Sequence, residues 1–167
     1  MINLRKMNKD DYYKIYKWCL NKEVYEWFEQ RKLSYKEIEE KYNRKIKEQD
    51  IYIINYDNTD IGLVQIYKYK DNLDILKKYN NIYEFDIFIG ENNYLNKGIG
   101  KYIVEYIKNL IYSKYNANYI ILRPFKRNIR AIKCYKKCNF IEIYNYIDKN
   151  TIGNIEEIIV LINKKRG

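Results

Sequence analysis

A chain of 167 residues that is 47% apolar, with a single proline, predicts one folded domain and excludes a disordered tail or a linker-rich array. It contains no histidine, which excludes Ser-His-Asp triads, Cys-His pairs and HExxH zinc sites, so we expect no metal site. Its 32 Lys and Arg against 22 Asp and Glu give a formal charge of +10, which is typical either of an anionic partner or of a basic surface without a role.

The first half of the chain predicts a strand, two helices and a hairpin. Asn8 is expected to cap the first helix, and the S-x-x-E pattern at Ser34 is a capping box for the second. A cluster of Asp and Asn residues over 57–60 marks the turn of an antiparallel hairpin. The expected elements are a strand at 2–7, helices at 9–20 and 34–48, and strands at 51–56 and 61–69.

The second half alternates strands and helices. Asn128 is a plausible cap for a short helix, and Pro124 ends the strand before it. The expected elements are a mobile polar loop at 70–81, strands at 82–89, 119–122, 140–147 and 155–162, a long helix from 99 to 111, and a short helix at 129–137. The order β-α-α-β-β-β-α-β-α-β-β predicts an α/β or α+β fold with a mixed sheet, as one domain over residues 1–167.

The sequence also indicates where the protein works. No apolar run approaches the roughly 20 residues that a membrane span needs, and the first residues lack the apolar core of a signal peptide. The three cysteines, Cys19, Cys134 and Cys138, form no CxxC pair and fit a reducing compartment. We therefore expect a cytoplasmic protein with no membrane partner, present as a monomer or homodimer.

A glycine-rich turn is the strongest local signal for a ligand. It reads Asn96-Lys97-Gly98-Ile99-Gly100-Lys101 and opens the long helix after the strand Phe85-Asp86-Ile87-Phe88-Ile89-Gly90. Backbone N–H groups of such a turn can approach an anion closely, and the helix dipole adds partial positive charge. The turn has neither the Walker spacing nor the dinucleotide-binding spacing. It predicts a phosphate cradle, with a tight loop that binds nothing as the alternative.

A second segment, over residues 128–140, favours the cradle. It reads N-I-R-A-I-K-C-Y-K-K-C-N-F. Together with the glycine turn it resembles the GNAT superfamily of acetyl-CoA-dependent N-acetyltransferases, whose motifs are [QR]-x-x-G-x-[GA] and N-x-x-A-x-x-x-Y-x-x-x-G-F. Leu95 stands where Gln or Arg is usual, and Asn139 where Gly is usual. Both departures are compatible with the motifs, because backbone amides bind the phosphates and Asn tolerates positive φ. The resemblance implies a GNAT-like acyl-CoA N-acyltransferase fold and acetyl-CoA as cofactor.

Within this superfamily the chain is most similar to aminoglycoside 6'-N-acetyltransferases, over roughly residues 2–160. The shared pieces are Trp27-Phe28, I-G-x-x-Q-x-Y from residue 61, D-x-F-[IL]-G from residue 86, K-G-[IL]-G and N-x-R-A-I-[RK]-x-Y. The resemblance implies acetyl transfer to a primary amine of a small molecule, with the 6'-amino group of an aminoglycoside as the first candidate. Other acceptors, a polyamine or a protein N-terminus, are the alternatives.

The resemblance implies two catalytic residues. Asp86 matches the proposed base of the family, and Tyr135 matches the tyrosine that protonates the leaving thiolate. Each has a structural alternative: Asp86 as a carboxylate that pairs with Lys or Arg in an apolar strand, and Tyr135 as core packing. Cys134 and Cys138, four residues apart, are expected to pack, because the family transfers acetyl directly.

The resemblance also implies a set of binding residues. Cofactor contacts are expected from Phe88, Ile89, Lys97, Gly98, Ile99, Gly100, Lys101, Asn128, Ala131 and Tyr135. Acceptor contacts are expected from Trp27, Glu29, Gln65, Tyr67, Asp71, Asp86 and Arg123. A polycationic acceptor needs carboxylates, for which Glu29, Asp71 and Asp74 are candidates, with a solvated surface as the alternative. Arg123 stands where many relatives have Asp, and its charge favours an acidic acceptor over a polyamine sugar.

The basic charge leaves one alternative of another class, a nucleic-acid-binding module. Phosphate contacts by Lys and Arg supply most of the affinity of such proteins. That interpretation explains neither the glycine turn nor the N-x-x-A-x-x-x-Y helix. We therefore expect a small-molecule amine as substrate and no nucleic acid.

Overall fold

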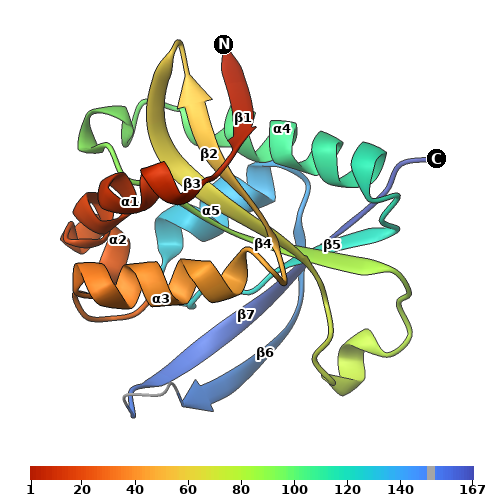
Figure 1. Ribbon diagram of the computed structural model, residues 1–167. Coiled ribbons are helices and arrows are strands. Elements are labelled where there is room, and N and C mark those ends of the chain that lie inside the picture. Colours follow the sequence, from red (N-terminus) through yellow and green to blue (C-terminus); the bar gives the residue numbers. More distant parts are fainter. Residues whose placement is uncertain (150–152) are drawn as a thin grey trace. The chain divides into compact units, whose positions relative to one another are not determined.

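The computed structural model (Figure 1) describes residues 1–149 and 153–167. These residues form two compact units. The first unit contains residues 1–67 and 85–99, and the second contains residues 68–84 together with the described part of 100–167. Strand β4 (Ile82–Ile89) is divided between them after Glu84. Each unit buries a hydrophobic cluster of its own. One domain over the whole chain stays a prediction.

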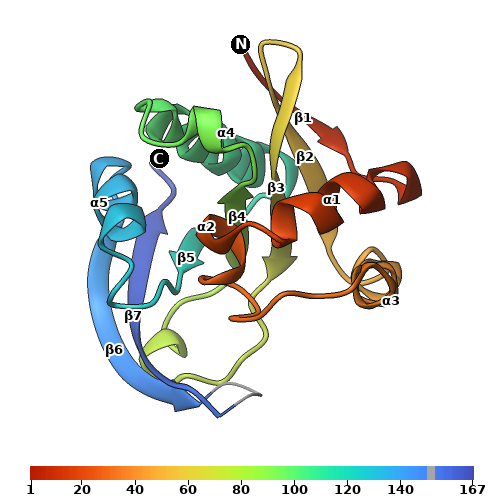
Figure 2. The same ribbon diagram turned by 90° about the vertical axis from the view of Figure 1, so that its left-hand side faces the viewer.

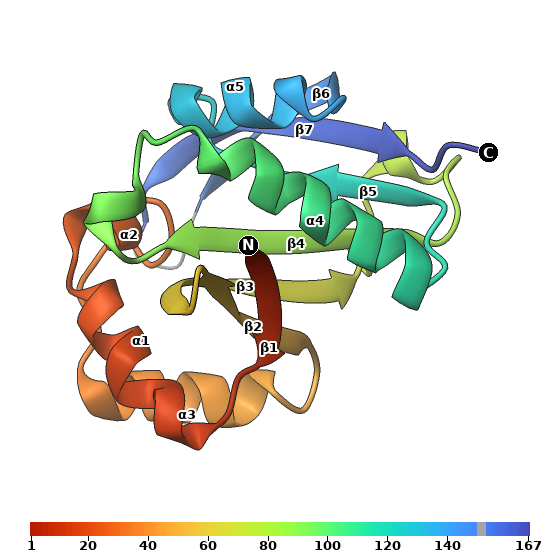
Figure 3. The ribbon, with the colours of Figure 1, turned by 90° about the horizontal axis from the view of Figure 1, so that it is seen from above.

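The first unit consists of strands that are covered by helices. Its elements are β1 (Ile2–Lys6), α1 (Tyr12–Cys19), α2 (Lys22–Tyr25), α3 (Tyr35–Lys45), β2 (Asp50–Tyr56), β3 (Thr59–Lys68) and the C-terminal part of β4, with 3-10 turns at Lys9–Asp11 and Asn92–Tyr94. The strands follow the order β1-β2-β3-β4, and the first three pair antiparallel. Figure 3 shows α1 and α3 side by side, both on the same side of these strands.

Polar caps set the start of these helices, as the sequence predicts. Ser34 Oγ accepts a hydrogen bond from the Glu37 N–H at 3.2 Å, and a Glu37 carboxylate oxygen accepts one from the Ser34 N–H at 2.7 Å. Asn8 and Asp11 make the same reciprocal pair. The turn after Asn8 is a 3-10 turn, however, so α1 begins at Tyr12 and not at residue 9. Helix α2 was not predicted.

The hairpin between β2 and β3 turns on two residues. Asp57 and Asn58 have φ of 46° and 66°, a left-handed conformation that Asn and Asp tolerate better than other residues with a side chain. Two such residues match the twist of the flanking strands. Thr59 and Asp60, predicted as part of the turn, therefore belong to β3.

The core of the first unit lies between its strands and α1 and α3. Ile15 on α1, Ile38 on α3, Ile53 on β2 and Leu63 on β3 are fully buried and belong to one cluster. Phe88 on β4 joins them at 7% exposure. Apolar residues at alternate strand positions and on one side of each helix produce this arrangement. It fixes one face of β4 against the helices.

The second unit contains a mixed sheet. Its elements are the N-terminal part of β4, a 3-10 turn at Asp74–Leu76, α4 (Ile99–Lys114), β5 (Tyr119–Leu122), α5 (Ile129–Lys137), β6 (Ile141–Lys149) and β7 (Ile155–Lys164). The strands follow the order β4-β5-β7-β6, with β4 and β5 parallel and the other pairs antiparallel. Figure 2 shows α5 beside the hairpin of β6 and β7. The predicted α/β class with a mixed sheet is confirmed.

The connection between β3 and β4 differs from the expected polar loop. Leu76 is 1% exposed and packs in a cluster with Ile82, Ile121 and Val160, and Tyr69 and other half-buried residues of the connection surround it. Burial of these side chains removes apolar surface from water. The expected loop at 70–81 is confirmed apart from the 3-10 turn at Asp74–Leu76, but the segment is not polar throughout, because apolar side chains stand among its charged residues and anchor it in the core.

Other boundaries agree closely with expectation. Strand β5 and helix α5 begin and end at the predicted residues. Strand β6 begins at Ile141 and not at Phe140, because Asn139 adopts φ 66° and Phe140, 2% exposed, turns into the core. None of the helices formed by residues 1–149 and 153–167 is long and apolar enough to cross a membrane.

Candidate active site

The carboxylate of Asp86 lies on β4 in the first unit. Phe85 and Phe88, on the same strand, are 2% and 7% exposed, whereas Asp86 is half-buried. Tyr67 Oη on β3 donates a hydrogen bond of 3.1 Å to Asp86 Oδ2. A charged group in apolar surroundings is costly unless partners stabilise it. The strand thus holds one carboxylate in an environment that can tune its basicity.

Further polar side chains of the first unit interact with Asp86, directly or through one another. Lys41 Nζ on α3 pairs with a Glu29 carboxylate oxygen at 2.6 Å. Lys45 Nζ, one turn later, donates a hydrogen bond of 3.1 Å to Gln65 Oε1. Gln65 is buried, with only 2% of its surface exposed. The group that we call the Asp86 cluster comprises Glu29, Lys41, Lys45, Gln65, Tyr67 and Asp86.

The charges of this cluster act on one another. Burial lowers the pKa of Lys45, as does the charge of Lys41, while the carboxylates of Asp86 and Glu29 oppose this. Burial acts to raise the pKa of Glu29, but the charge and hydrogen bond of Lys41 outweigh it and hold this pKa below its ordinary value. Two carboxylates and two ammonium groups therefore balance within one small region.

Two glycines allow close packing around the strand that carries Asp86. A Cβ added at Gly62 on β3 would lie 2.2 Å from the carbonyl oxygen of Phe88, so β3 and β4 approach closely only with glycine there. A Cβ at Gly90 would lie 2.1 Å from the Trp18 ring, whose Nε1 donates to Glu91 at 2.7 Å. The glycines of I-G-x-x-Q-x-Y and D-x-F-[IL]-G therefore serve packing around β4.

The glycine turn has the backbone that the cradle requires. Asn96 and Gly98 have φ of 57° and 75°, and Ile99 begins the 16-residue helix α4. A Cβ added at Gly98 would meet no other atom within 4 Å. The exposed turn therefore offers the N–H groups of a helix start to an anion. Such a site fits a pyrophosphate group.

Helix α5 carries the second motif, in the second unit. Asn128 Oδ1 accepts a hydrogen bond from the Ala131 N–H at 3.3 Å, so Asn128 is an N-cap, as its alternative role predicts. Tyr135 is half-buried, and its ring lies 6.2 Å from that of Phe140. Cys138 is fully buried, which agrees with packing as its role.

Comparison with known proteins identifies the family to which a chain with this glycine turn and this α5 motif belongs. The family model described as acetyltransferase (GNAT) domain matches residues 8–146. The chain belongs to the GNAT acetyltransferases. The enzymes of this family take the acetyl group from acetyl-CoA, which is the predicted cofactor.

Individual relatives of this GNAT chain are distant in sequence. Aminoglycoside N(6')-acetyltransferases type 1 of Klebsiella pneumoniae and Serratia marcescens are each 24% identical over 147 residues, which cover 83% of this chain and 73% of theirs. A crystal structure of an aminoglycoside acetyltransferase with coenzyme A and kanamycin has a TM-score of 0.83 at 21% identity, covering 99% of this chain and 95% of the other. Spermidine N-acetyltransferase of Vibrio cholerae with CoA and spermine has a TM-score of 0.79 at 20% identity, covering 98% and 95%. These structures share its fold.

Arg123 of the GNAT chain is neutralised within the second unit. Its guanidinium donates to both carboxylate oxygens of Glu84, at 2.7 and 2.8 Å, and to Asp71 at 2.7 Å. It also lies over the Tyr69 ring, 5.4 Å from the centroid. Burial acts to lower the pKa of Arg123, but these two carboxylates outweigh burial and raise it. Asp71 and Arg123 thus form an ion pair with each other.

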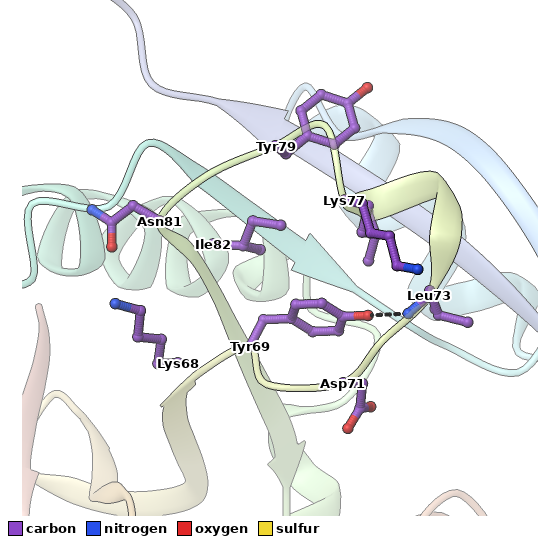
Figure 4. Close-up of a pocket in the computed structure, with 9 residues that line it drawn as sticks. Lys68, Tyr69, Asp71, Leu73, Lys77, Tyr79, Asn81 and Ile82 are labelled. Carbon is purple, nitrogen blue, oxygen red and sulfur yellow. Dashed lines mark hydrogen bonds between the residues drawn. The ribbon is translucent and has the colours of Figure 1, made fainter.

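Asp71 and Tyr69 also line a pocket of the second unit (Figure 4). Tyr69 Oη accepts a hydrogen bond of 3.1 Å from the Leu73 N–H, which orders the segment after β3. Lys77 lies on the far side of this opening, and Tyr79 is on the segment that returns to β4. The pocket therefore mixes aromatic rings with both signs of charge.

The two units divide the predicted site residues between them. The first unit brings Glu29, Gln65, Tyr67 and Asp86 together, and the second brings Asp71 to Arg123. The residues predicted for the cofactor and the acceptor lie as follows: Trp27, Phe88, Ile89, Lys97, Gly98 and Ile99 in the first unit, and Gly100, Lys101, Asn128, Ala131 and Tyr135 in the second. The Phe88 side chain packs against Trp18 and Phe28 and also lines a small pocket of the first unit with Glu29 and Lys41.

Sequence reasoning missed three charged residues beside these sites. Lys45 stands seven residues after Ile38 on α3, a spacing that places both on one side of the helix. Lys41 precedes it by one turn. Glu84 stands two residues before Asp86, and alternate residues share a strand face. Helical and strand spacing could have placed all three on these faces, but not identified the partners that the faces meet. Among the described residues no group of three or more Cys, Asp or Glu is arranged to hold a metal ion.

Proposed function

We propose that this GNAT chain transfers an acetyl group from acetyl-CoA to the primary amine of a small molecule. The 6'-amino group of an aminoglycoside is the first acceptor to test, because curated relatives with that activity align over most of the chain. The observation that carries the proposal is the half-buried Asp86, held by Tyr67 on an apolar strand. A carboxylate so placed can act as a base in a chain without histidine.

The residues act as follows. Acetyl-CoA supplies the acetyl group as a thioester. Asp86 accepts a proton from the acceptor ammonium, directly or through water, which frees the nitrogen lone pair for attack on the thioester carbonyl. Tyr135 Oη gives a proton to the sulfur that leaves. The N–H groups of the glycine turn, at the start of α4, hold the pyrophosphate.

The backbone of β4 supplies donors for the oxyanion. The Gly90 N–H donates to a β3 carbonyl at 2.7 Å, and the Phe88 carbonyl also faces β3. Peptide groups of successive residues in a strand point to opposite edges, so the N–H groups of Ile87 and Ile89 point away from β3. We assign one of them to the developing negative charge on the acetyl oxygen.

Thiol release from acetyl-CoA tests the proposal. We expect saturable release with kanamycin or another amine, and none with acetyl-CoA alone beyond slow hydrolysis. Calorimetry should give one equivalent of bound acetyl-CoA. A chain that binds no acetyl-CoA, or that releases no thiol with aminoglycosides, polyamines or peptide N-termini, would contradict the proposed activity.

A further inference from the structure

The Asp86 cluster contains two cations of its own. Lys41 and Lys45 lie one turn apart on α3, and the Lys41 side chain is only 14% exposed. Lys41 already pairs with Glu29. Lys45 donates a hydrogen bond to the buried Gln65, and the negative charge of Asp86 attracts the Lys45 ammonium group. The cluster therefore sums two negative and two positive formal charges to zero.

This balance matters for an acceptor amine. A site for a polycation needs carboxylates that are not already neutralised, because each extra ammonium must exchange its water for a protein partner. Here Glu29, a candidate partner, is occupied by Lys41. Because the two lysines cancel the two carboxylates, the cluster gives no net attraction to the further ammonium groups of an acceptor whose reacting amine lies near Asp86. At an effective dielectric constant of about 20, one uncompensated carboxylate at roughly 10 Å would raise the affinity for such an ammonium group about tenfold.

We propose that Lys41 and Lys45 restrict the acceptor to amines that carry few positive charges, so that a mono-ammonium amine is preferred over a polycation. This inference rests on the proposed function and narrows it. The two lysines are specificity residues: they act on the charges of the acceptor that do not react. Polycations such as kanamycin and spermine should then have a lower kcat/KM than they would have without the two lysines.

The competing interpretation is that the lysines only stabilise the fold. As counter-ions of Glu29 and Asp86 they would offset the cost of burying two carboxylates. Their replacement would then lower the melting temperature, while the ratio of activities toward different amines would not change. The two interpretations therefore differ in selectivity and not only in stability.

The test compares acceptors that share a reacting group but differ in charge. The acceptors are 6-amino-6-deoxyglucose, with one amine, kanamycin, and spermine. The variants are Lys41→Gln, Lys45→Gln and the double variant, and the matched control is Lys36→Gln, an exposed lysine of the same helix. We expect the ratio of kcat/KM for kanamycin to kcat/KM for the mono-amine to rise about tenfold in the double variant, mainly through KM. The control should keep the wild-type ratio.

Salt gives a second readout. Salt screens the attraction between the uncovered carboxylates and an ammonium group, so the difference in selectivity between wild type and double variant should shrink at high salt. A ratio that stays within twofold of wild type in the double variant, or that falls, overturns the inference.

The outcome remains separable from that of the proposed function. Calorimetric binding of the same amines without acetyl-CoA gives the same comparison of affinities and needs no turnover. Absence of thiol release with any amine would contradict the proposed function, while the ratio of binding affinities would still decide the role of the lysines. Equal loss of affinity for mono-amine and polycation in the double variant would contradict the inference alone.

Discussion

Asp86 is the residue on which the proposed chemistry depends, and its replacement separates two roles. Asp86→Asn keeps the shape but removes the base, so we expect kcat to fall by about 10²- to 10⁴-fold. Melting temperature and acetyl-CoA affinity should hardly change. Tyr67→Phe, which removes only the 3.1 Å hydrogen bond, is the control and should cost much less activity. If Asp86→Asn melts much lower yet turns over within a few-fold of wild type, Asp86 is part of the scaffold.

Arg123 tests the opposite case, a charge that serves the structure. Arg123→Leu leaves the Glu84 carboxylate, whose side chain is 3% exposed, without its bidentate partner. Removal of one member of a buried ion pair costs about 3–5 kcal/mol, which urea unfolding measures. The double variant Arg123→Leu with Glu84→Leu should recover much of that loss. If Arg123→Leu loses little free energy of unfolding and the double variant recovers none of it, the Glu84 carboxylate does not depend on Arg123 for its stability.

Single residues were predictable where local rules govern them. Asn128 as a helix cap and Asp86 as a carboxylate in an apolar strand follow from neighbours in the sequence. Lys45 and Glu84 depend on which face of an element meets which neighbour, and that is decided by tertiary packing. The charge of Arg123 was predicted to favour an acidic acceptor, which stays a prediction, whereas its pairing with Glu84 and Asp71 was not predicted.

At the scale of the element, the glycine turn before α4 makes a specific prediction. Gly98 has φ 75°, which a β-branched residue adopts only at a cost of about 1–3 kcal/mol. Gly98→Val should therefore displace the turn and weaken acetyl-CoA binding by about tenfold or more in calorimetry. Gly98→Asn, a residue that tolerates positive φ, should lose less. If both folded variants bind acetyl-CoA with the affinity of wild type, the turn is not part of the cofactor site.

Strand β1, the 3-10 turn after it and β3 are tied by one charged group. Arg5 donates to Asp11 at 2.7 and 3.0 Å and to Asp60 at 2.7 Å. Burial acts to raise the pKa of Asp60, but hydrogen bonds from Arg5, Lys14 and Asn55 outweigh it and hold this pKa below the ordinary 3.8. A carboxylate with a lowered folded-state pKa stabilises the protein above its unfolded-state pKa, and this contribution is lost as pH falls below it.

Unfolding measured from pH 6 downward checks this tie. Wild type should lose stability as pH falls below about 5. Arg5→Met should be less stable at pH 6 by about 1–3 kcal/mol and should lose less on acidification. Lys6→Met, which removes an exposed pair with Asp50, is the control and should follow the wild-type curve. Parallel curves for wild type and Arg5→Met would contradict the assignment.

Elements were predictable where pattern and cap coincide. The S-x-x-E box fixed the start of α3, and two residues able to adopt positive φ fixed the hairpin. The connection at 70–81 was not predictable as an ordered segment, because Leu76 and its neighbours are buried only through strands that follow much later in the chain. Helix α2 is a single turn and has no periodic pattern to detect.

At the scale of the whole molecule, the formal charge of +10 makes the final prediction. The GNAT family assignment explains the two motifs without it, so the basic charge requires no nucleic-acid partner. Binding to a phosphate backbone would fall steeply with salt, by about 10³- to 10⁵-fold between 50 and 200 mM salt for six to ten contacts. We expect weak, non-specific binding to duplex DNA or RNA at low salt that disappears at physiological salt, while one equivalent of acetyl-CoA still binds. Fluorescence anisotropy with labelled duplexes and calorimetry with acetyl-CoA, on one preparation, measure both. Tight nucleic-acid binding at physiological salt with no acetyl-CoA binding would reverse the conclusion, since a family fold can persist where its cofactor site has been lost.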